Sequence, residues 1–446
     1  MTEPQRSHTG ASKPALAKEL ENKIRSRRAQ VGIVGLGYVG LPLAVELAGA
    51  GFHVTGIDVS EAKTQRVNLA DSYVGDVPSE ALAPLVESGN LRATTDFSVI
   101  RELDTINICV PTPLRKTKDP DMSYIQSACQ EIAKYFHPGM LVILESTTYP
   151  GTTDEVLLPM LTQPGMEVGR DFFLCFSPER VDPGNPQFQT ANIPKVVGGS
   201  TPVCTELGRL FYSQALQKVV PVSSTRVAEM VKLLENTFRM INIGLVNEMA
   251  LMCDRIGINV WEVIDAAATK PFGFMPFYPG PGLGGHCIPI DPFYLSWKTK
   301  QAGIEARFIE LAGYINGQMP HFVVDKVRDA LNTSAKPVRG SRIHIMGVAY
   351  KRNIDDVRES PALDVMLLLK RLGATISYSD PHVPALHLDG GDLVAQPEEA
   401  VAAADCVVII TDHSAFNYKA LVERAALIVD TRNALKGIQS EKIVRL

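Results

Sequence analysis

One short segment of the chain has the residue types of a covalent active site. Residues 281–292 read Pro-Gly-Leu-Gly-Gly-His-Cys-Ile-Pro-Ile-Asp-Pro, which places Cys287 in a glycine-rich loop four residues before Asp291. A thiolate can attack a carbonyl carbon, and a neighbouring carboxylate can act as an acid or a base. Gly284 and Gly285 leave room beside the thiol. The alternative is that Cys287 is a small buried hydrophobic residue, as most cysteines are.

A glycine motif near the start of the chain is typical of a dinucleotide-binding loop. Gly35-Leu-Gly37-Tyr-Val-Gly40 follows a strand-like segment and begins a helical one. The first glycine permits a tight turn, the second lets the backbone approach a pyrophosphate, and the third lets the helix pack on the strand. Asp58 ends the next strand, where a carboxylate binds ribose hydroxyls and repels a 2′-phosphate. We therefore expect NAD rather than NADP, with a purely structural glycine turn as the alternative.

The two motifs together indicate more than a simple alcohol oxidation. A nicotinamide site beside a nucleophilic thiol is typical of an enzyme that holds an aldehyde covalently and then oxidises it again.

Polar residues follow several further strand-like segments. In an open parallel sheet the ligand lies beyond the carboxyl ends of the strands, which places Thr112, Glu145 and Thr147 where they could meet the cofactor and the reacting carbon. Turn and cap chemistry would equally explain them. Glu179 follows another strand. Its carboxylate could activate a water molecule or transfer a proton, or it could form a surface salt bridge.

Two further groups of candidate residues contain lysine or arginine. Lys232 and Asn236 are four residues apart on a helical segment and share a face, where an ammonium and an amide could stabilise an oxyanion. A lysine reaching along the helix edge to water is the alternative. Lys351, Arg358 and Arg432 follow strands of a second α/β pattern that has no GxGxxG motif. They either bind phosphate through their side chains or are ordinary surface residues.

Two sheets and a helical segment are needed to position these residues. Strand and helix patterns alternate early in the chain and again after residue 340, which predicts an α/β fold with two Rossmann-like parallel-sheet domains joined by a central helical domain with a long helix. We expect the strands at residues 31–35, 54–58, 105–110, 141–145, 172–177, 342–347, 374–379, 405–411 and 426–430, and a largely helical linker over 317–340.

The long helix of the central domain is expected over residues 225–256. Apolar residues occur on nearly every face of this segment, so a second element or a second subunit must cover it. At 1.5 Å per residue it would be about 45 Å long. We expect a homodimer or a higher homo-oligomer built on it.

Composition excludes several classes of protein. The 446 residues have a net charge of −5, which gives no reason to expect nucleic-acid binding. No apolar run reaches the roughly 18 residues of a membrane span. Seven scattered cysteines without a CxxC pair favour a reduced, cytoplasmic protein with neither a disulfide framework nor a bound metal. Residues 1–13 are expected to be a disordered tail, and 14–28 a short helix.

Taken together, these segments resemble the nucleotide-sugar 6-dehydrogenase family, which includes the UDP-glucose and GDP-mannose dehydrogenases. The resemblance covers nearly the whole chain after residue 30 and runs through Gly35–Pro42, Glu145–Thr153, Ser177–Gly184, Lys232–Glu248, Pro279–Leu295, Gly347–Leu363 and Asp430–Asn433. It implies an N-terminal tail and short helix (1–30), an NAD-binding Rossmann domain (31–216), a central helical dimerisation domain with the catalytic cysteine loop (217–320), and a C-terminal nucleotide-sugar-binding α/β domain (321–446).

The resemblance also implies a reaction. The C6 hydroxyl of a UDP-sugar would be oxidised to a carboxylate with two NAD, through a thiohemiacetal and then a thioester on Cys287. Asp291 or Glu179 would activate the water that releases the uronate, while Thr147 positions a water or the C6 oxygen. Such products serve surface polysaccharides such as O-antigen and capsule. Residues 276–295 are most similar to the UDP-N-acetylglucosamine branch; UDP-N-acetylmannosamine and UDP-glucose are the alternatives.

The site residues that the resemblance implies fall into three groups. The catalytic group is Cys287, Lys232, Asn236, Asp291, Glu179 and Thr147. The cofactor group is Gly35, Gly37, Tyr38, Val39, Gly40, Asp58, Lys63, Pro111, Thr112, Thr147, Glu179 and Arg358. The substrate group is Arg180, Lys232, Asn236, Phe277, Tyr278, Gly284, Lys351 and Arg432.

Some residues depart from the UDP-glucose dehydrogenase pattern. That pattern has Pro-Glu-Phe-Leu where this chain has Pro-Glu-Arg-Val at residues 178–181, and a second glutamate where this chain has Pro183. It also has an arginine that reaches across the dimer, where this chain reads Lys-Pro-Phe-Gly-Phe from Lys270. Two other functional classes stay open. A single-step NAD-dependent dehydrogenase would need no cysteine, and an inactive nucleotide-sugar sensor would produce no NADH.

Overall fold

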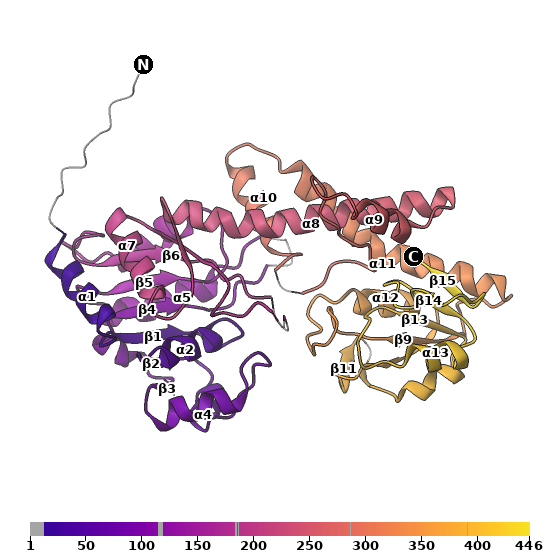
Figure 1. Cartoon of the computed structure of the whole chain (residues 1–446), viewed down its shortest axis with the longest axis horizontal. Helices are drawn as coiled ribbons and strands as arrows, with labels where there is room; N and C mark the ends of the chain where they lie inside the picture. Colours follow the sequence, from indigo (N-terminus) through magenta and orange to yellow (C-terminus); the bar gives the residue numbers. More distant parts are fainter. Residues whose placement is uncertain (1–12, 115–118, 183–184, 186, 286, 390) are drawn as a thin grey trace, which may run out of the picture. The chain divides into compact units, whose positions relative to one another are not determined.

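The computed structural model describes residues 13–114, 119–182, 185, 187–285, 287–389 and 391–446. Within it the chain forms two compact units, which meet between Leu233 and Leu234 and are described separately below (Figure 1). The tail expected over residues 1–13 lies outside the described part except for Lys13. The short helix expected after it is α1, Ala15–Arg25.

The first unit is built on an eight-stranded sheet with the strand order β3-β2-β1-β4-β5-β6-β7-β8. Its strands are β1 Gln30–Val34, β2 His53–Ile57, β3 Leu91–Thr94, β4 Thr105–Ile108, β5 Leu141–Leu144, β6 Phe173–Phe176, β7 Lys195–Gly199 and β8 Val219–Val222. Neighbouring strands are parallel except for β6 and β7, which are antiparallel. The order reverses direction between β1 and β4, which is where such sheets bind ligands.

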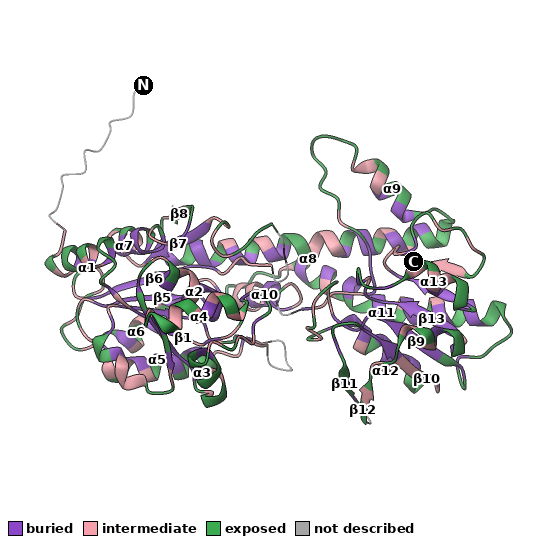
Figure 2. Cartoon of the chain, turned by 60° about the horizontal axis from the view of Figure 1, so that its bottom comes forward, coloured by how far each residue is buried: buried purple, intermediate pink, exposed green. Residues whose placement is uncertain are grey.

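Helices cover both faces of this sheet because its strands are apolar on both sides. In β5, Leu141 and Ile143 belong to one buried cluster, while Val142 and Leu144 belong to the other. This period of two is what a strand buried on both faces requires. The helices are α2 Gly40–Gly49, α3 Glu61–Asn68, α4 Ser79–Glu87, α5 Ser123–Tyr135, α6 Leu158–Leu161 and α7 Pro202–Tyr212, with short turns at Phe97–Glu102 and Thr153–Leu157. Figure 2 shows the strands buried and the outer helix faces exposed.

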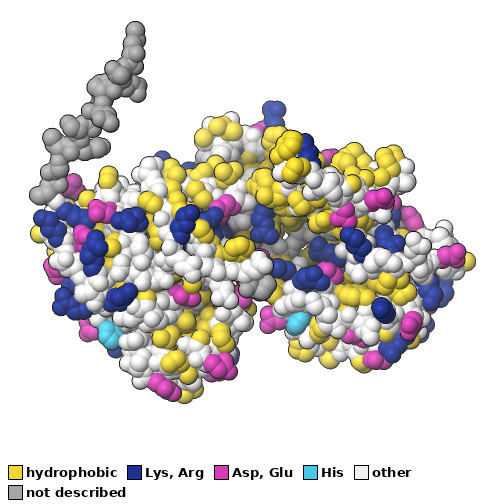
Figure 3. Space-filling model, viewed as in Figure 1, with side chains coloured by type: hydrophobic (Ala, Val, Ile, Leu, Met, Phe, Trp, Pro, Cys, Tyr) yellow, Lys and Arg dark blue, Asp and Glu magenta, His cyan; other side chains and the backbone are white. Residues whose placement is uncertain are grey.

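The long helix expected over 225–256 is α8, Thr225–Ile256, and it runs from the first unit into the second. The expectation that it is covered on all sides is not met within one chain. One stripe of apolar side chains stays exposed: Val227, Met230, Leu234, Phe238, Leu245, Met252 and Ile256. Figure 3 shows hydrophobic side chains gathered over α8 and its neighbouring segments.

In the described part of the second unit, three helices follow α8 and precede a smaller sheet. The helices are α9 Val260–Ala267, α10 Asp291–Gln301 and α11 Arg307–Thr333. The sheet is parallel throughout, with the order β10-β9-β13-β14-β15. Its strands are β9 Arg342–Met346, β10 Thr375–Ser379, β13 Cys406–Ile409, β14 Ile428–Asp430 and β15 Ile443–Arg445; α12 Pro361–Arg371, α13 Tyr418–Arg424 and the hairpin β11 Ala385–Leu388 with β12 Gly391–Val394 complete the unit.

The expected fold class is confirmed, with differences in detail. The sequence did not predict β3, β7, β8, β15 or the hairpin, whose strands are only three to five residues long. The linker helix starts at Arg307, ten residues before its expected start, and ends at Thr333. It ends there because Ala335 has a positive φ of 55° and Pro337 follows. Within the described residues, no helix is long and apolar enough to cross a membrane.

Candidate active site

The glycine loop between β1 and α2 has the geometry of a phosphate cradle. Gly35 has a φ of 94°, and a Cβ there would lie 2.7 Å from the carbonyl oxygen of Cys109. A Cβ on Gly40 would collide with the carbonyl oxygen of Gly35, so the helix can pack this closely only with glycine. A Cβ on Gly37 would meet nothing within 4 Å. Gly37 therefore opens space at the N-terminus of α2, where backbone amides and the helix dipole favour an anion. The cradle fits the pyrophosphate of NAD.

Asp58 ties this loop to the end of β2. One carboxylate oxygen accepts the Leu36 amide at 2.8 Å, and the other accepts the Ser60 amide at 2.9 Å. Lys63, on α3, has its ammonium 3.7 Å from the same carboxylate. Tyr38 is exposed and Val39 is half-buried at the start of α2. The expected cofactor residues of this loop therefore lie together.

The loops after β4 and β5 are joined to each other. The Ser146 hydroxyl donates to the Val110 carbonyl at 2.7 Å, which holds the loop of Pro111 and Thr112 beside that of Thr147. Thr112 is buried, whereas Thr147 is half-buried and Pro111 is exposed. Thr112 and Thr147 thus lie at the carboxyl edge of neighbouring strands, as the sequence led us to expect.

Glu145 directly follows β5, and other residues of the first unit surround its carboxylate. Its side chain is fully buried, and it accepts hydrogen bonds from Tyr212 at 2.5 Å, Asn107 at 2.7 Å and Lys195 at 2.5 Å. Lys195 also donates to the Glu179 carboxylate at 3.0 Å. Glu145 therefore anchors a polar network inside the first unit.

Glu179 lies between this network and α8. One of its carboxylate oxygens accepts the backbone amides of Arg180 and Val181, and the other accepts Lys195. Burial by itself would raise the pKa of Glu179, but the charge and hydrogen bond of Lys195, together with the two amides, hold that pKa below its usual range. The Glu179 carbonyl accepts the ammonium of Lys232 at 2.5 Å. The alternative of a surface salt bridge for Glu179 does not hold, since its lysine partner is buried.

Glu229 joins the start of α8 to the loop after β5. Its buried carboxylate accepts the backbone amides of Gly151 and Thr153 and the Thr153 hydroxyl. These amides open the helical turn that follows the Thr147 loop, so the carboxylate satisfies donors that a helix N-terminus would otherwise leave unpaired. Glu229 and Lys232 therefore fix the first turns of α8 against two loops of the candidate site.

In the second unit, Asn236, Asp291 and Cys287 lie close together. The Asn236 amide donates to the buried Asp291 carboxylate at 2.6 Å. The Asp291 amide donates to the Cys287 carbonyl at 2.8 Å, so the two residues are separated by one helical turn at the start of α10. Cys287 is exposed, whereas the other six cysteines are all buried. The alternative in which Cys287 is a buried hydrophobic residue is therefore wrong.

The glycine-rich loop before Cys287 packs tightly on its surroundings. A Cβ on Gly280 would lie 2.5 Å from the Arg432 guanidinium, and one on Gly284 would lie 2.6 Å from the Tyr350 Cβ. The Gly280 amide donates to Asn247 at 3.0 Å, and the Gly285 amide donates to the Arg358 carbonyl at 3.0 Å. The glycines are thus required by close packing as well as by access to the thiol.

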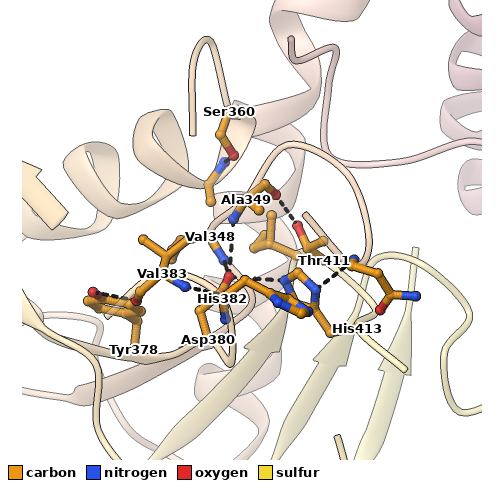
Figure 4. A network of polar contacts seen from close by, with 12 residues as sticks. Val348, Ala349, Ser360, Tyr378, Asp380, His382, Val383, Thr411 and His413 are labelled. Atoms are coloured by element: carbon orange, nitrogen blue, oxygen red, sulfur yellow. Dashed lines mark hydrogen bonds and ion pairs between the residues drawn. The ribbon is translucent and has the colours of Figure 1, made fainter. Parts of the chain in front are cut away.

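The second sheet has its own reversal of strand order, between β9 and β13. Asp380 organises the loops there, as Figure 4 shows: it accepts the amides of Val348, Ala349, His382 and Val383 and the Nε2–H of His413. His413 accepts the Asn353 amide through Nδ1, which fixes the tautomer that donates to Asp380. Lys351 lies in the loop that this network shapes.

Arg432 follows β14 in the same unit. Its Nε donates to the Ile410 carbonyl at 2.9 Å, and among the described residues its terminal nitrogens have no acceptor. Burial lowers the pKa of Arg432, although the charge of Asp412 opposes this. A partly buried guanidinium with unused donors is suited to a phosphate ligand.

Three residues of the expected ligand groups make side-chain contacts within the second unit. Phe277 packs on Phe238, with ring centroids 5.8 Å apart. Tyr278 stacks on Trp261 and donates to Asp265 at 2.9 Å. The Arg358 guanidinium pairs with Asp356 at 2.6 Å. Arg180 in the first unit similarly donates to the Pro194 carbonyl at 2.6 Å.

Sequence reasoning missed Lys195, Glu229, Asp380 and His413. A charged residue that opens an otherwise apolar strand, as in Lys-Val-Val-Gly-Gly from Lys195, is the signal that could have identified the first. The other three become visible only when their loop partners are placed in space.

Comparison with known proteins gives three matches to one family. Residues 29–216 match the NAD-binding domain of the UDP-glucose/GDP-mannose dehydrogenase family, residues 226–318 match its central domain, and residues 344–437 match its UDP-binding domain. The chain belongs to the UDP-glucose/GDP-mannose dehydrogenase family. It is therefore an NAD-dependent nucleotide-sugar dehydrogenase, an oxidoreductase with a UDP-binding C-terminal domain, as the resemblance implied.

Individual relatives of this dehydrogenase support the same conclusion. The chain is 37% identical over 403 residues to UDP-N-acetyl-D-mannosamine dehydrogenase of Salmonella typhi, covering 86% of this chain and 94% of that one. It is 36% identical over 416 residues to NDP-N-acetyl-D-galactosaminuronic acid dehydrogenase of Ralstonia nicotianae, covering 90% and 95%. The solved structure of a UDP-D-ManNAc dehydrogenase from Pyrococcus horikoshii superposes with a TM-score of 0.85 at 32% identity, covering 93% and 98%.

Asp58 generates a prediction about cofactor choice. We expect kcat/KM for NAD to exceed that for NADP by at least about tenfold, because a carboxylate repels a 2′-phosphate. Asp58→Asn should narrow this ratio mainly by improving the use of NADP. Steady-state kinetics with both cofactors measures the ratio of the two kcat/KM values. Asp71→Asn is the control, because it neutralises an exposed acid that is paired to Arg66. Equal kcat/KM values in the unaltered enzyme would contradict the prediction.

Proposed function

We propose that this dehydrogenase oxidises C6 of a UDP-N-acetylhexosamine to the carboxylate through a covalent intermediate on Cys287. The observation that carries the proposal is the exposed thiol of Cys287, one turn from the Asp291–Asn236 pair, in a chain whose other cysteines are buried. A dehydrogenase that stopped at the aldehyde would need no such thiol.

In this proposal each residue of the site has a separate role. The glycine loop and Asp58 would hold NAD, which would supply the hydride acceptor for each of the two oxidations. The Cys287 thiolate adds to the aldehyde carbon and forms a thiohemiacetal, whose oxidation leaves a thioester. Lys232 and Asn236 stabilise the oxyanions, and Thr147 positions a water or the C6 oxygen. Water attacks the thioester, which releases the uronate and regenerates the thiol.

Asp291 is the better candidate for activating that water. Both carboxylate oxygens of Glu179 already accept hydrogen bonds, and Lys195 lowers its pKa, which makes it a weak base. Asp291 is one turn from Cys287. Glu179 is then a residue that orients Lys232 through its carbonyl group.

The sugar is the finer part of the proposal. The resemblance of residues 276–295 to the UDP-N-acetylglucosamine branch supports that substrate, which would give UDP-N-acetylglucosaminuronate for a surface polysaccharide such as O-antigen or capsule. UDP-N-acetylmannosamine is the second candidate, because dehydrogenases of that name are among the relatives. All the relatives described above have an N-acetylated sugar in their names, which supports the N-acetyl group over UDP-glucose. In the reduced cytoplasm that we propose as the setting, the Cys287 thiol would stay available.

A substrate panel tests this choice. UDP-N-acetylglucosamine, UDP-N-acetylmannosamine, UDP-N-acetylgalactosamine, UDP-glucose and GDP-mannose are compared by kcat/KM and by the ratio of NADH to product. We expect two NADH per uronate and the highest kcat/KM with an N-acetylhexosamine. One NADH per product would indicate a single-step dehydrogenase, and no NADH with any sugar would favour a sensor.

Substitution of Cys287 separates the two oxidations. Cys287→Ala should lose uronate formation by at least about 10³-fold, because it removes a pathway and not merely a contact. Cys287→Ser should accumulate an ester, since an alkoxide leaves less readily than a thiolate. Quenched-flow mass spectrometry on the serine variant detects the adduct, and NAD binding should be unchanged in both.

The matched control for this experiment is Cys406→Ala, which truncates a buried cysteine of β13. It should lower stability but keep two NADH per product. Full turnover by Cys287→Ala with that stoichiometry would show that the thiol has no covalent role.

We further propose that two copies of the chain associate through the exposed stripe of α8. At 100° per residue the stripe lies on the side of the helix opposite Glu229, Lys232 and Asn236. A second copy could therefore cover it without reaching the face that carries these residues.

Glutamates introduced on the exposed stripe of α8 test whether two copies of the chain associate through it. Leu245→Glu with Met252→Glu should convert the oligomer to monomers at micromolar concentration, because the contact would bury two unpaired carboxylates. Light scattering measures the mass. Arg239→Glu is the control, an exposed residue of α8 about 120° from the stripe. A monomeric, active unaltered enzyme would contradict the proposal.

A further inference from the structure

Among the described residues of the first unit, Lys195 is the most enclosed cation that has two acidic partners. Its side chain is 5% exposed and lies between the carboxylates of Glu145, at 2.5 Å, and Glu179, at 3.0 Å. Burial alone would lower the pKa of Lys195, but the two carboxylates outweigh this and raise it. Lys195 is therefore a fixed positive charge beside a residue that contacts Lys232.

The antiparallel pairing of β6 and β7 explains why Lys195 lies there. Phe176 pairs with Gly198 and Cys175 with Gly199, and the same register extended past β6 places Lys195 opposite Glu179. Two side-chain hydrogen bonds link the same two segments: the Ser177 hydroxyl donates to the Val196 carbonyl, and the Arg180 guanidinium donates to the Pro194 carbonyl. The only reversed strand pair of the described first sheet thus delivers a lysine to the carboxyl edge.

The acceptors around Lys195 are fully satisfied. Tyr212 and Asn107 donate to one oxygen of Glu145, and Lys195 donates to the other. The two backbone amides after Glu179 complete its carboxylate. Such a network costs desolvation and gives little net stability, but it fixes the two carboxylates closely because each of their oxygens has a partner.

Glu179 links Lys195 to Lys232 on α8. Its side chain is held by Lys195, while its carbonyl accepts Lys232 at 2.5 Å. An ammonium has three donors, so two remain for a ligand once this one is used. The direction of those two donors depends on where the Glu179 backbone sits.

We propose that Lys195 is a positioning residue for the oxidation: by clamping Glu179 against Glu145, it sets the direction in which Lys232 presents its ammonium to the oxyanion. This inference rests on the proposed role of Lys232. It adds a residue that never touches the substrate and that acts through two others.

The first test is Lys195→Met, which keeps the length of the side chain and removes its charge. We expect kcat to fall about 10²-fold, as for a misplaced catalytic group, with KM for NAD and for the nucleotide sugar changed by less than about threefold. Rates are expressed per NAD-binding site, so that a loss of folded protein does not count. Lys218→Met, the same exchange on an exposed lysine just before β8, should leave kcat unchanged.

A charge-matched variant addresses folding. Lys195→Met leaves two buried carboxylates without a cation, whereas Glu145→Gln with Lys195→Met keeps the net charge of the original triad. The double variant should recover thermal stability but not kcat. Lys195→Arg should retain at least about a tenth of the original kcat, since it restores the cation. Recovery of kcat by the uncharged double variant would reduce Lys195 to a structural role and overturn the proposal.

A structural readout keeps the test independent of activity. Crystal structures of the unaltered enzyme and the double variant give the separation between the Lys232 ammonium and the Glu179 carbonyl. We expect that hydrogen bond to be lost or redirected in the variant, and an unchanged contact would overturn the inference. If the unaltered enzyme oxidises no nucleotide sugar, the proposed function fails, yet this comparison still decides whether Lys195 positions Lys232.

Discussion

Parallel strands impose the constraint on which both units depend. Because parallel strands end at one edge, the loops after β1, β2, β4 and β5 meet there in the first unit, and those after β9, β10, β13 and β14 meet in the second. The first edge carries the glycine loop, Thr112 and Thr147. The second edge carries Lys351 and Arg432. Neither set needs a special fold, only short loops of suitable chemistry on a buried sheet.

Buried carboxylates give these loops their shape. Asp58 holds the glycine loop, Glu229 holds the loop after β5, and Asp380 holds three loops of the second sheet. Each accepts several backbone amides, which compensates for the desolvation of its charge and leaves the loop with one conformation. The predicted site residues Thr147 and Lys351 thus lie in or beside loops whose backbone amides are held by a buried carboxylate.

Local patterns explain which parts the sequence could predict. The spacing of Gly35, Gly37 and Gly40 and the setting of Cys287 are short-range signals, and the structure gives these residues the turns and the exposure that the spacing implies. Lys195 gives a weaker local signal, a charged residue that opens an otherwise apolar strand, and its place beside Glu179 follows only from the reversed β6–β7 pairing. The same holds for Glu145, whose partners come from three other elements.

The sequence of the long helix α8 predicts more burial than the helix has within one chain. Hydrophobic residues on nearly every face suggest complete cover, yet two separate demands produce that pattern. One face carries Glu229, Lys232 and Asn236, each buried and hydrogen-bonded to a loop or to Asp291. The opposite face carries the exposed stripe from Val227 to Ile256. Since a rigid helix couples its two sides, cover on the stripe would restrict bending of α8 and thereby limit the motion of Lys232 and Asn236.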